Sequence, residues 1–472
     1  MTELHQLGAV AAARAIRRGE ITAEALAGAL LGRMKAHAEL NCFVDTDPAA
    51  VLEAARVADL ARASGATMGA LHGVPLTFKD NINIAGLTTT GGTPALRHHR
   101  PTRNARVAQS LVAAGAIALG KNGMHELSFG ITSNNATFGA PRNPYDPAMI
   151  AGGSSGGTAA AVAARLAPAG IGTDTGGSVR IPASLCGLAG FRPTTGRWPL
   201  SGIVPISHTR DTPGPLARHV EDLVVLDAVV TSDTAPLEAA TPRGIRLGVP
   251  RRHFWESLDD AVRRQCEAAL ETLRHAGVTL IEVDIADVIA VDRLSSFVVT
   301  LFEIRPMLGQ YLAEEGLALT YEDIVRACES PDVSALLLPT LDPAQAIGEA
   351  HYREALNTHR PHLLRLYREH FARDQVDAYV FPTCPLVARP IGHDVTVDFN
   401  GEQVGTFDAF MRNTGPGSNA DLPGLTLPLG VDPSGLPIGL SLDAPAGHDR
   451  RLLAIGLALE AILGQGPAPA RY

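Results

Sequence analysis

Two short clusters that combine glycine with serine carry the most chemical information in this sequence. Residues 152–157 read GGSSGG and residues 176–178 read GGS, with a stretch of small residues between them. Glycine allows backbone conformations that bare N–H groups, so a serine held among glycines can attack a carbonyl whose oxygen those N–H groups bind. The two clusters therefore predict acyl transfer.

A lysine upstream of both clusters is the candidate base. Burial lowers the pKa of a lysine toward neutral pH, and serine–lysine catalysis needs no histidine. Lys79 stands in GVPLTFKDN. We expect a strand within residues 71–84 that carries Lys79 outward at its end, between an apolar run and a polar loop. Taken alone, a lysine in this position is typical of a solvated side chain.

Three sequence blocks in a fixed order favour a catalytic role for these residues. GVPLTFKDN, GGSSGGTAAAVA and GTDTGGSVRIPASLCGLAGFRPT together resemble the amidase signature family of serine amidases. The similarity begins near ITAEALAGALLGRM and ends with DLPGLTLPLGVDPSGLPIGLSLDAPAGHDRRLLAIGLALE, and only about residues 220–375 match weakly. Ser154 and Ser178 are 24 residues apart, which is the spacing of the family.

The resemblance implies a Ser–cis-Ser–Lys triad. In such a triad neutral Lys79 takes a proton through Ser154, whose peptide bond to Gly153 is cis, while Ser178 Oγ attacks the substrate carbonyl. The implied oxyanion hole consists of the backbone N–H groups of Thr175, Gly176, Gly177 and Ser178. Three further positions match residues that brace the site in the family, and we assign them supporting roles, with a turn cap or a surface ion pair as the competing interpretation: Ser155, Asp174 and Arg180.

The rest of the sequence predicts the elements that hold this site. Thr22 can cap a helix in which Leu26 and Leu30 recur at helical spacing. Helical stretches alternate with short apolar strands at residues 116–119, 241–250, 278–285, 376–385 and 436–445. The alternation favours an α/β fold, the amidase signature fold, with a mixed, mostly parallel central sheet covered by helices on both faces.

We expect a single domain over residues 1–472. Within it, residues 1–70 form an N-terminal helical segment, residues 71–215 the catalytic core, and residues 251–375 a variable helical insertion that covers the core. The insertion is richer in charge and lacks the glycine clusters. A mobile cover of this kind would suit bulky substrates.

Composition excludes several classes of protein. The net charge is −9 without a sustained basic run, so direct nucleic-acid binding is not expected. The N-terminus carries Glu3 and Arg14 where a signal peptide would be apolar, and no uncharged run is long enough to cross a membrane, which predicts a soluble, cytoplasmic protein. The five cysteines show no CxxC spacing, and we expect them to be buried small hydrophobes.

Other motifs fit less well. Residues 152–156 also match G-x-S-x-G, but that elbow needs an acid and a histidine at separate strand ends. Residues 115–121 match G-x-x-x-x-G-K, yet Asn122 replaces the Ser or Thr of a phosphate loop. His125-Glu126 lacks the second histidine of HExxH, no S-x-x-K occurs, and we predict no metal and no cofactor.

The substrate is a small molecule in the interpretation that we favour. Within the family, MHELSFGIT and FRPTTGRWPLSGIVPISHTRDTPGPLAR resemble hydrolases of aryl and arylalkyl amides of the indoleacetamide and mandelamide type. Aryl carbamates (urethanes) present the same carbonyl beside nitrogen. The candidate lining of the acyl pocket, for which ordinary packing is the competing interpretation, consists of Met124, Gly130, Ile131, Phe297 and Phe302.

Two other function classes stay open. One is the glutaminase (A) subunit of a glutamyl-tRNA amidotransferase, which would need a carboxylate-binding arginine that the sequence does not place. The other is a non-catalytic binding relative, which would normally lack one of Lys79, Ser154 and Ser178. The resemblance also implies a homodimer as the oligomeric state.

Overall fold

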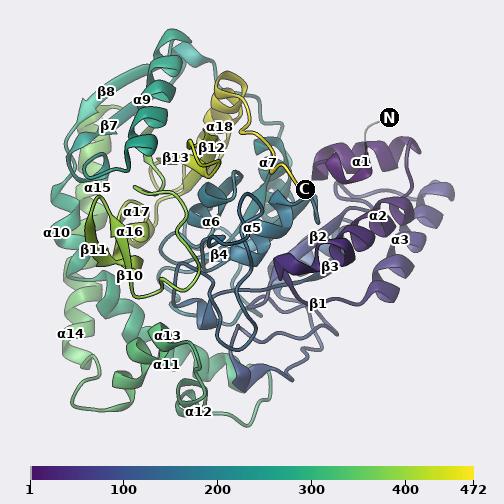
Figure 1. Cartoon of the computed structure of the whole chain (residues 1–472), viewed down its shortest axis with the longest axis horizontal. Helices are drawn as coiled ribbons and strands as arrows, with labels where there is room; N and C mark the ends of the chain where they lie inside the picture. Colours follow the sequence, from purple (N-terminus) through teal and green to yellow (C-terminus); the bar gives the residue numbers. More distant parts are fainter. Residues whose placement is uncertain (1–2) are drawn as a thin grey trace.

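One large sheet runs through the molecule, with helices packed against both of its faces, in the computed structural model shown in Figure 1. The structure describes residues 3–472. In this part of the chain the sheet has 11 strands, in the spatial order β1 (Phe43–Asp45), β3 (Ile117–Asn122), β2 (Pro75–Lys79), β4 (Ala169–Asp174), β6 (Thr212–Ala217), β5 (Ala189–Arg192), β12 (Gly424–Val431), β13 (Pro437–Asp443), β9 (Ala378–Pro382), β7 (Arg246–Pro250) and β8 (Thr279–Val283). A separate hairpin joins β10 (Thr396–Phe399) to β11 (Glu402–Gly405).

The mixed α/β sheet that the sequence predicts is confirmed, but the expectation that it is mostly parallel is wrong, because six of the ten neighbouring pairs are antiparallel. Parallel pairs occur in two groups, β3–β2–β4 on one side and β9–β7–β8 on the other. Between these groups, β4, β6, β5, β12, β13 and β9 pair antiparallel. For the pair β12–β13 the reason is local, because a short turn joins the two strands and no crossover helix separates them as parallel pairing would require.

Different helices cover the two faces of the sheet. The α-helices of this part of the fold are α4 (Arg106–Ala113), α5 (Gly156–Ala163), α6 (Arg180–Leu185), α7 (Val220–Thr231), α9 (Asp260–His275), α16 (Thr406–Met411), α17 (Gly415–Asn419) and α18 (Asp449–Leu463). The small-residue helix α5 and the short α6 pack on the face that bears the serine clusters, where Gly170 leaves room for Thr158 of α5. Helices α7, α9 and α18 pack on the opposite face.

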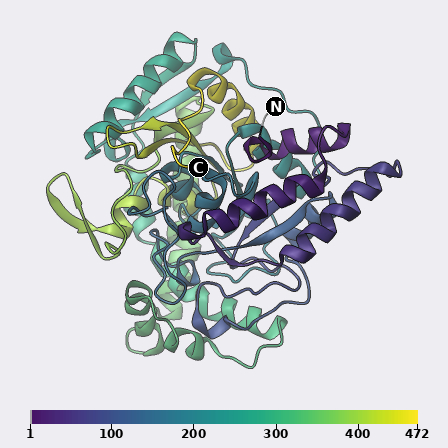
Figure 2. The ribbon, with the colours of Figure 1, turned by 45° about the vertical axis from the view of Figure 1, so that its right-hand side comes forward.

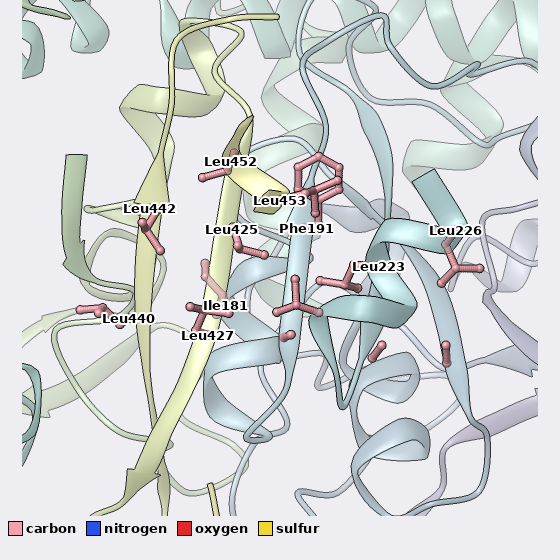
Figure 3. Packing of buried hydrophobic residues seen from close by; sticks show 14 of the residues in the cluster. Ile181, Phe191, Leu223, Leu226, Leu425, Leu427, Leu440, Leu442, Leu452 and Leu453 are labelled. Carbon is pink, nitrogen blue, oxygen red and sulfur yellow. The ribbon is translucent and has the colours of Figure 1, made fainter. Parts of the chain in front are cut away.

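The main core lies where the central strands meet α7 and α18. Figure 3 shows Leu425 and Leu427 of β12 beside Leu440 and Leu442 of β13, with Leu452 of α18 packed over them. All five are buried, as are most residues of both strands. Along both strands leucine or isoleucine alternates with smaller or polar residues, and Gly439 faces Ser184 of α6 while the leucines face this core.

Helices α1 (Ala9–Arg18), α2 (Ala23–Ala36) and α3 (Pro48–Ala63) lie together at the β1 side of the sheet, where Figure 2 brings them forward. The predicted cap of α2 is confirmed, because Thr22 Oγ1 accepts a hydrogen bond from the Ala25 N–H at 3.0 Å. Within residues 3–472 no helix combines the length and apolar character needed to span a membrane. Of the five cysteines, all free, four are buried and Cys328 is partly buried.

Residues 251–375 contribute mainly helices, and also strand β8. The helices are α8 (Arg251–Phe254), α9, α10 (Asp287–Arg293), α11 (Ser296–Glu314), α12 (Tyr321–Arg326), α13 (Pro331–Leu337), α14 (Glu349–Glu354) and α15 (Arg360–Asp374). We call α11 to α14 the cover helices, and they gather at one end of the molecule in Figure 1. Their apolar cluster, which includes Ile304, Leu308 and Val333, packs against Phe129 and Ile206 of the core. The division of the chain into segments stays a prediction.

Candidate active site

The lysine lies inside the molecule. Lys79 is the last residue of β2, and its side chain is fully buried, so the expectation that it projects outward is wrong. Its Nζ lies 2.7 Å from Ser154 Oγ and 2.7 Å from Thr173 Oγ1, and Asn81 Nδ2 donates to the same Thr173 hydroxyl at 3.1 Å. These polar partners at the carboxyl ends of β2 and β4 hold the amino group in place.

Burial changes the acid–base chemistry of this lysine. Desolvation lowers the pKa of Lys79 to about 7, against the opposing charges of Asp211 and Asp174. A lysine with this pKa is neutral in a large share of molecules at neutral pH, and a neutral amine accepts protons. Lys79 is therefore equipped to act as a base on the Ser154 hydroxyl.

The loop that carries Ser154 is held from several sides. The peptide bond between Gly153 and Ser154 is cis, as the resemblance implies. The Ser154 carbonyl accepts hydrogen bonds from the His125 N–H and from Ser133 Oγ, both at 3.2 Å. A Cβ on Gly153 would lie 2.8 Å from the backbone of Ile131, so the close approach of the two loops requires glycine at this position.

Ser178 lies at the border between the buried site and a pocket, with 8% of its surface exposed. Within residues 3–472, the N–H groups of Gly176, Gly177 and Ser178 donate to no other protein atom. Gly177 adopts φ +143°, and a Cβ on it would lie 2.3 Å from Thr414 Oγ1. This loop therefore presents backbone donors of the kind that an oxyanion needs.

The two candidate serines are joined through backbone and neighbours. The Ser155 N–H donates to the Ser178 carbonyl at 3.3 Å, and Ser155 Oγ donates to the Thr173 carbonyl at 3.2 Å. Across the described chain, no hydrogen bond links the hydroxyl groups of Ser154 and Ser178. Ser155 thus ties the first glycine cluster to the second and to β4.

A buried group of charges anchors the end of β4. Asp174 Oδ2 accepts hydrogen bonds from Arg180 Nε and from the Val179 N–H, both at 3.1 Å, and Asp174 Oδ1 accepts from Arg192 Nη1 at 3.1 Å. Burial raises the pKa of Asp174, but the two guanidinium groups outweigh it and hold the pKa well below its usual range. Arg180 also pairs with Asp443 at 3.3 Å, which balances two positive with two negative charges. Asp174 and Arg180 are where the resemblance places bracing residues.

The carboxylate of Asp211 holds the loop that begins at Thr175, directly after β4. Asp211 Oδ1 accepts from Thr175 Oγ1 at 2.6 Å, and Asp211 Oδ2 accepts from the N–H groups of Ile206 and Ser207 at 2.8 and 3.0 Å. Burial raises the pKa of Asp211, and these hydrogen bonds oppose that shift. Asp211 fixes the loop of residues 206–211 against the candidate oxyanion loop.

A pocket opens beside Ser178, and most of its surface is apolar. It is lined by Ser128, Phe129, Gly130, Ile131, Thr175, Gly176, Gly177, Ser178, Ile206, Arg210, Ser296, Phe297, Thr300, Phe407 and Met411. The rings of Phe297 and Phe407 lie with centroids 5.6 Å apart. Three of the predicted lining residues, Gly130, Ile131 and Phe297, are found there.

Two predicted lining residues lie elsewhere. Phe302 stacks on Tyr352 with ring centroids 3.9 Å apart, because five residues along α11 turn it about 140° away from Phe297. Met124 is buried behind the pocket, since the chain turns at Leu127 (φ 49°) and Ser128 (φ 62°) before it reaches the lining.

Comparison with known proteins agrees with this geometry. Residues 25–453 match the family model described as Amidase. The chain belongs to the amidase family. It is 43% identical to an indoleacetamide hydrolase of Rhizobium radiobacter, over 95% of this chain and 95% of that protein. It is 40% identical to a mandelamide hydrolase of Pseudomonas putida, over 99% of this chain and 94% of the other. A crystal structure of an amidase superposes with a TM-score of 0.86 at 35% identity and covers 97% of this chain and 100% of that one. The protein is therefore an amide hydrolase.

Several residues of this amidase site were not predicted from the sequence. Thr173, Arg192, Asp211 and Arg210 are buried polar residues whose partners lie far away in the chain. Phe407 and Met411 reach the pocket from α16, which no motif marks. The segment SHTRDTPG contains Arg210 and Asp211, but nothing in its residue pattern distinguishes these two side chains from surface charges.

Polar contacts also connect the amidase core to the cover helices. The Glu126 carboxylate accepts hydrogen bonds from the N–H groups of Glu329 and Ser330, the latter at 2.7 Å, at the start of α13. His125 Nε2 lies 2.9 Å from Asp332 Oδ2. Since the His125 N–H binds the Ser154 carbonyl, a single loop connects the candidate relay serine to the cover. Elsewhere in residues 3–472, as here, no three His, Cys, Asp or Glu side chains group in a way that would hold a metal ion.

Proposed function

We propose that this amidase hydrolyses aryl or arylalkyl amides through Ser178, Ser154 and Lys79. The observation that carries the proposal is the fully buried Lys79, 2.7 Å from Ser154 Oγ and close to a loop whose N–H groups have no protein acceptor in the described chain. That combination supplies a base, a relay and an oxyanion site within one buried region.

The proposed reaction has two halves. Ser178 Oγ attacks the amide carbon while its proton passes to Ser154 and the Ser154 proton passes to Lys79, and the oxyanion rests on the N–H groups of Gly176 to Ser178. The C–N bond then breaks, and the relay returns the proton to the departing nitrogen. Water, activated by the same relay, attacks the acyl-enzyme and releases the acid.

The lining of the pocket supports an aromatic acyl group. Phe129, Phe297 and Phe407 contribute rings, and Ile131 and Met411 contribute aliphatic surface. Such walls favour an aryl group over a charged chain. The curated relatives named for indoleacetamide and mandelamide support the same class. Cleavage of aryl carbamates and assembly as a homodimer are further predictions of this proposal.

One observation supports a second candidate function, that of a glutaminase subunit. Arg210 lines the pocket, and a guanidinium is what a glutaminase needs to hold the carboxylate of glutamine. A glutaminase subunit would release ammonia from glutamine and leave aryl amides intact.

The test is amine or ammonia release by the purified chain alone. The panel contains an arylacetamide, an acetanilide, an aryl carbamate and glutamine, each with wild type and with Ser178→Ala. Release from the arylacetamide that is lost in Ser178→Ala is the expected result. Release from glutamine alone would replace the aryl proposal with the glutaminase, and release that survives Ser178→Ala would remove Ser178 from the mechanism.

A further inference from the structure

Arg210 is the charged side chain in an otherwise mostly apolar pocket lining. It is 3% exposed, and its Nη1 donates to Ser296 Oγ at 2.6 Å, to the Ser296 carbonyl at 2.9 Å and to Thr300 Oγ1 at 3.3 Å. These three bonds to α11 fix the plane of the guanidinium and leave its other nitrogens available to other partners.

Those other nitrogens have no protein acceptor in the part of the chain that the structure describes. Nε is buried without a hydrogen-bond partner, and all hydrogen bonds from this guanidinium to protein atoms among residues 3–472 come from Nη1, which leaves Nη2 without a protein acceptor there. Burial lowers the pKa of Arg210 to about 10, which Asp292 opposes, so the group stays charged at neutral pH. Asp292 and Asp211 act on this charge through space, without an ion-pair contact in the described chain. A buried guanidinium with a nitrogen that lacks an acceptor calls for one from outside the protein.

The position of Nη2 indicates where an acceptor on a bound molecule would lie. A Cβ built on Gly176 would lie 3.7 Å from Arg210 Nη2, which places this nitrogen beside the candidate oxyanion loop. A scissile carbonyl held on that loop would have its neighbouring carbon inside the pocket that Arg210 lines. An oxygen on this carbon would then be a candidate acceptor for Nη2, with the aryl group against the apolar walls.

We propose that Arg210 is a specificity-determining residue whose Nη2 donates a hydrogen bond to an oxygen on the carbon next to the scissile carbonyl. The favoured substrates are arylacetamides that carry a hydroxyl or keto oxygen at this carbon. The inference rests on the proposed function, because it takes the loop of Gly176 to Ser178 as the carbonyl-binding site.

The experiment compares matched amides. We measure kcat/KM for 2-phenylacetamide, 2-hydroxy-2-phenylacetamide and 2-oxo-2-phenylacetamide with wild type and with Arg210→Met. A hydrogen bond from a charged donor is worth roughly tenfold to a hundredfold, so wild type should prefer the oxygenated amides by about that factor. Arg210→Met should bring the ratio close to one. The ratio is independent of the fraction of enzyme that folds.

Arg218 provides the matched control. It is a partly buried arginine whose hydrogen bonds go to the carbonyls of Val162, Ala167 and Leu7, away from the pocket. Arg218→Gln should leave the preference for oxygenated amides unchanged, whatever it does to stability. A preference that persists in Arg210→Met, or an equal fall for all three amides, would overturn the proposal.

A binding measurement separates this inference from the reaction itself. In the Ser178→Ala background, calorimetry gives the ratio of Kd for the hydroxylated and plain amides, with and without the Arg210→Met substitution. A preference that depends on Arg210 supports the inference even where hydrolysis fails. Equal Kd values with Arg210 present would contradict it even where hydrolysis succeeds.

Discussion

The two walls of the active site are built in different ways. On one wall, Lys79, Asp174 and Arg180 are fully buried, and Lys79 binds Thr173 of β4 while Arg180 binds Asp174 at the end of that strand. On the other, Phe297 of α11 is 39% exposed and Phe407 of α16 is partly buried. The candidate catalytic groups are held at the ends of sheet strands, while much of the pocket lining lies on helices that meet solvent. Substitutions on the first wall should act on kcat, and those on the second on KM.

The largest effect should come from the base. Lys79→Met keeps the length of the side chain but removes the proton acceptor, so kcat/KM for an arylacetamide should fall roughly 10⁴-fold or more. A continuous assay of ammonia release measures the fall, with Lys35→Met, at an exposed lysine, as a control that should retain wild-type activity. Retention of even a tenth of the activity in Lys79→Met would show that another group is the base.

The next effect concerns stability on the same wall. Asp174→Asn leaves Arg180 and Arg192 buried without their shared carboxylate, which should reduce the free energy of unfolding by about 3–5 kcal/mol. Urea denaturation measures the change. Asp377→Asn removes a part-exposed ion pair with Arg451, at 3.0 Å, and should cost no more than about 1 kcal/mol. Similar losses in the two variants would mean that the buried charges do not anchor this wall.

The pH dependence tests the burial of Lys79 directly. Only the neutral amine accepts a proton, and its pKa is lowered to about 7, so kcat/KM should be level above that pH and fall about tenfold per pH unit below it. A profile between about pH 5 and 9 with a stable substrate shows the limb. A rise that continues toward the ordinary lysine pKa would mean that burial does not set the base.

The smallest effect distinguishes two phenylalanines of α11. Phe297→Ala removes a ring from the pocket and should raise KM about tenfold with little change in kcat, because the ring contacts substrate and transition state alike. Phe302→Ala, which removes a ring that stacks on Tyr352, should leave KM within about twofold. Equal effects on KM would contradict the assignment of Phe297 to the pocket lining and of Phe302 to packing away from the pocket.

The catalytic wall is far easier to predict from the sequence than the facing wall. Lys79, Ser154 and Ser178 stand in short blocks with glycine, whose spacing is visible along the chain. Arg210 and Phe407 reach the pocket only because distant segments fold against each other. Phe302 lies outside the pocket lining, because the pattern of this largely apolar helix does not show which of its faces meets the site. The large antiparallel share of the sheet escapes for a similar reason, since strand order depends on contacts that no local pattern records.

The central strands also decide when this enzyme becomes complete during synthesis. Arg180 binds Ser418 and Asp443, which lie 238 and 263 residues further along the chain, and β5 receives its neighbour β12 equally late. A nascent chain therefore lacks Ser418 and Asp443, two partners of Arg180, until most of the protein has been made. Contacts of such long separation form slowly, and an open strand edge invites association with other chains. The central sheet and the buried charges beside the site can therefore be completed only after β12 and β13 have emerged.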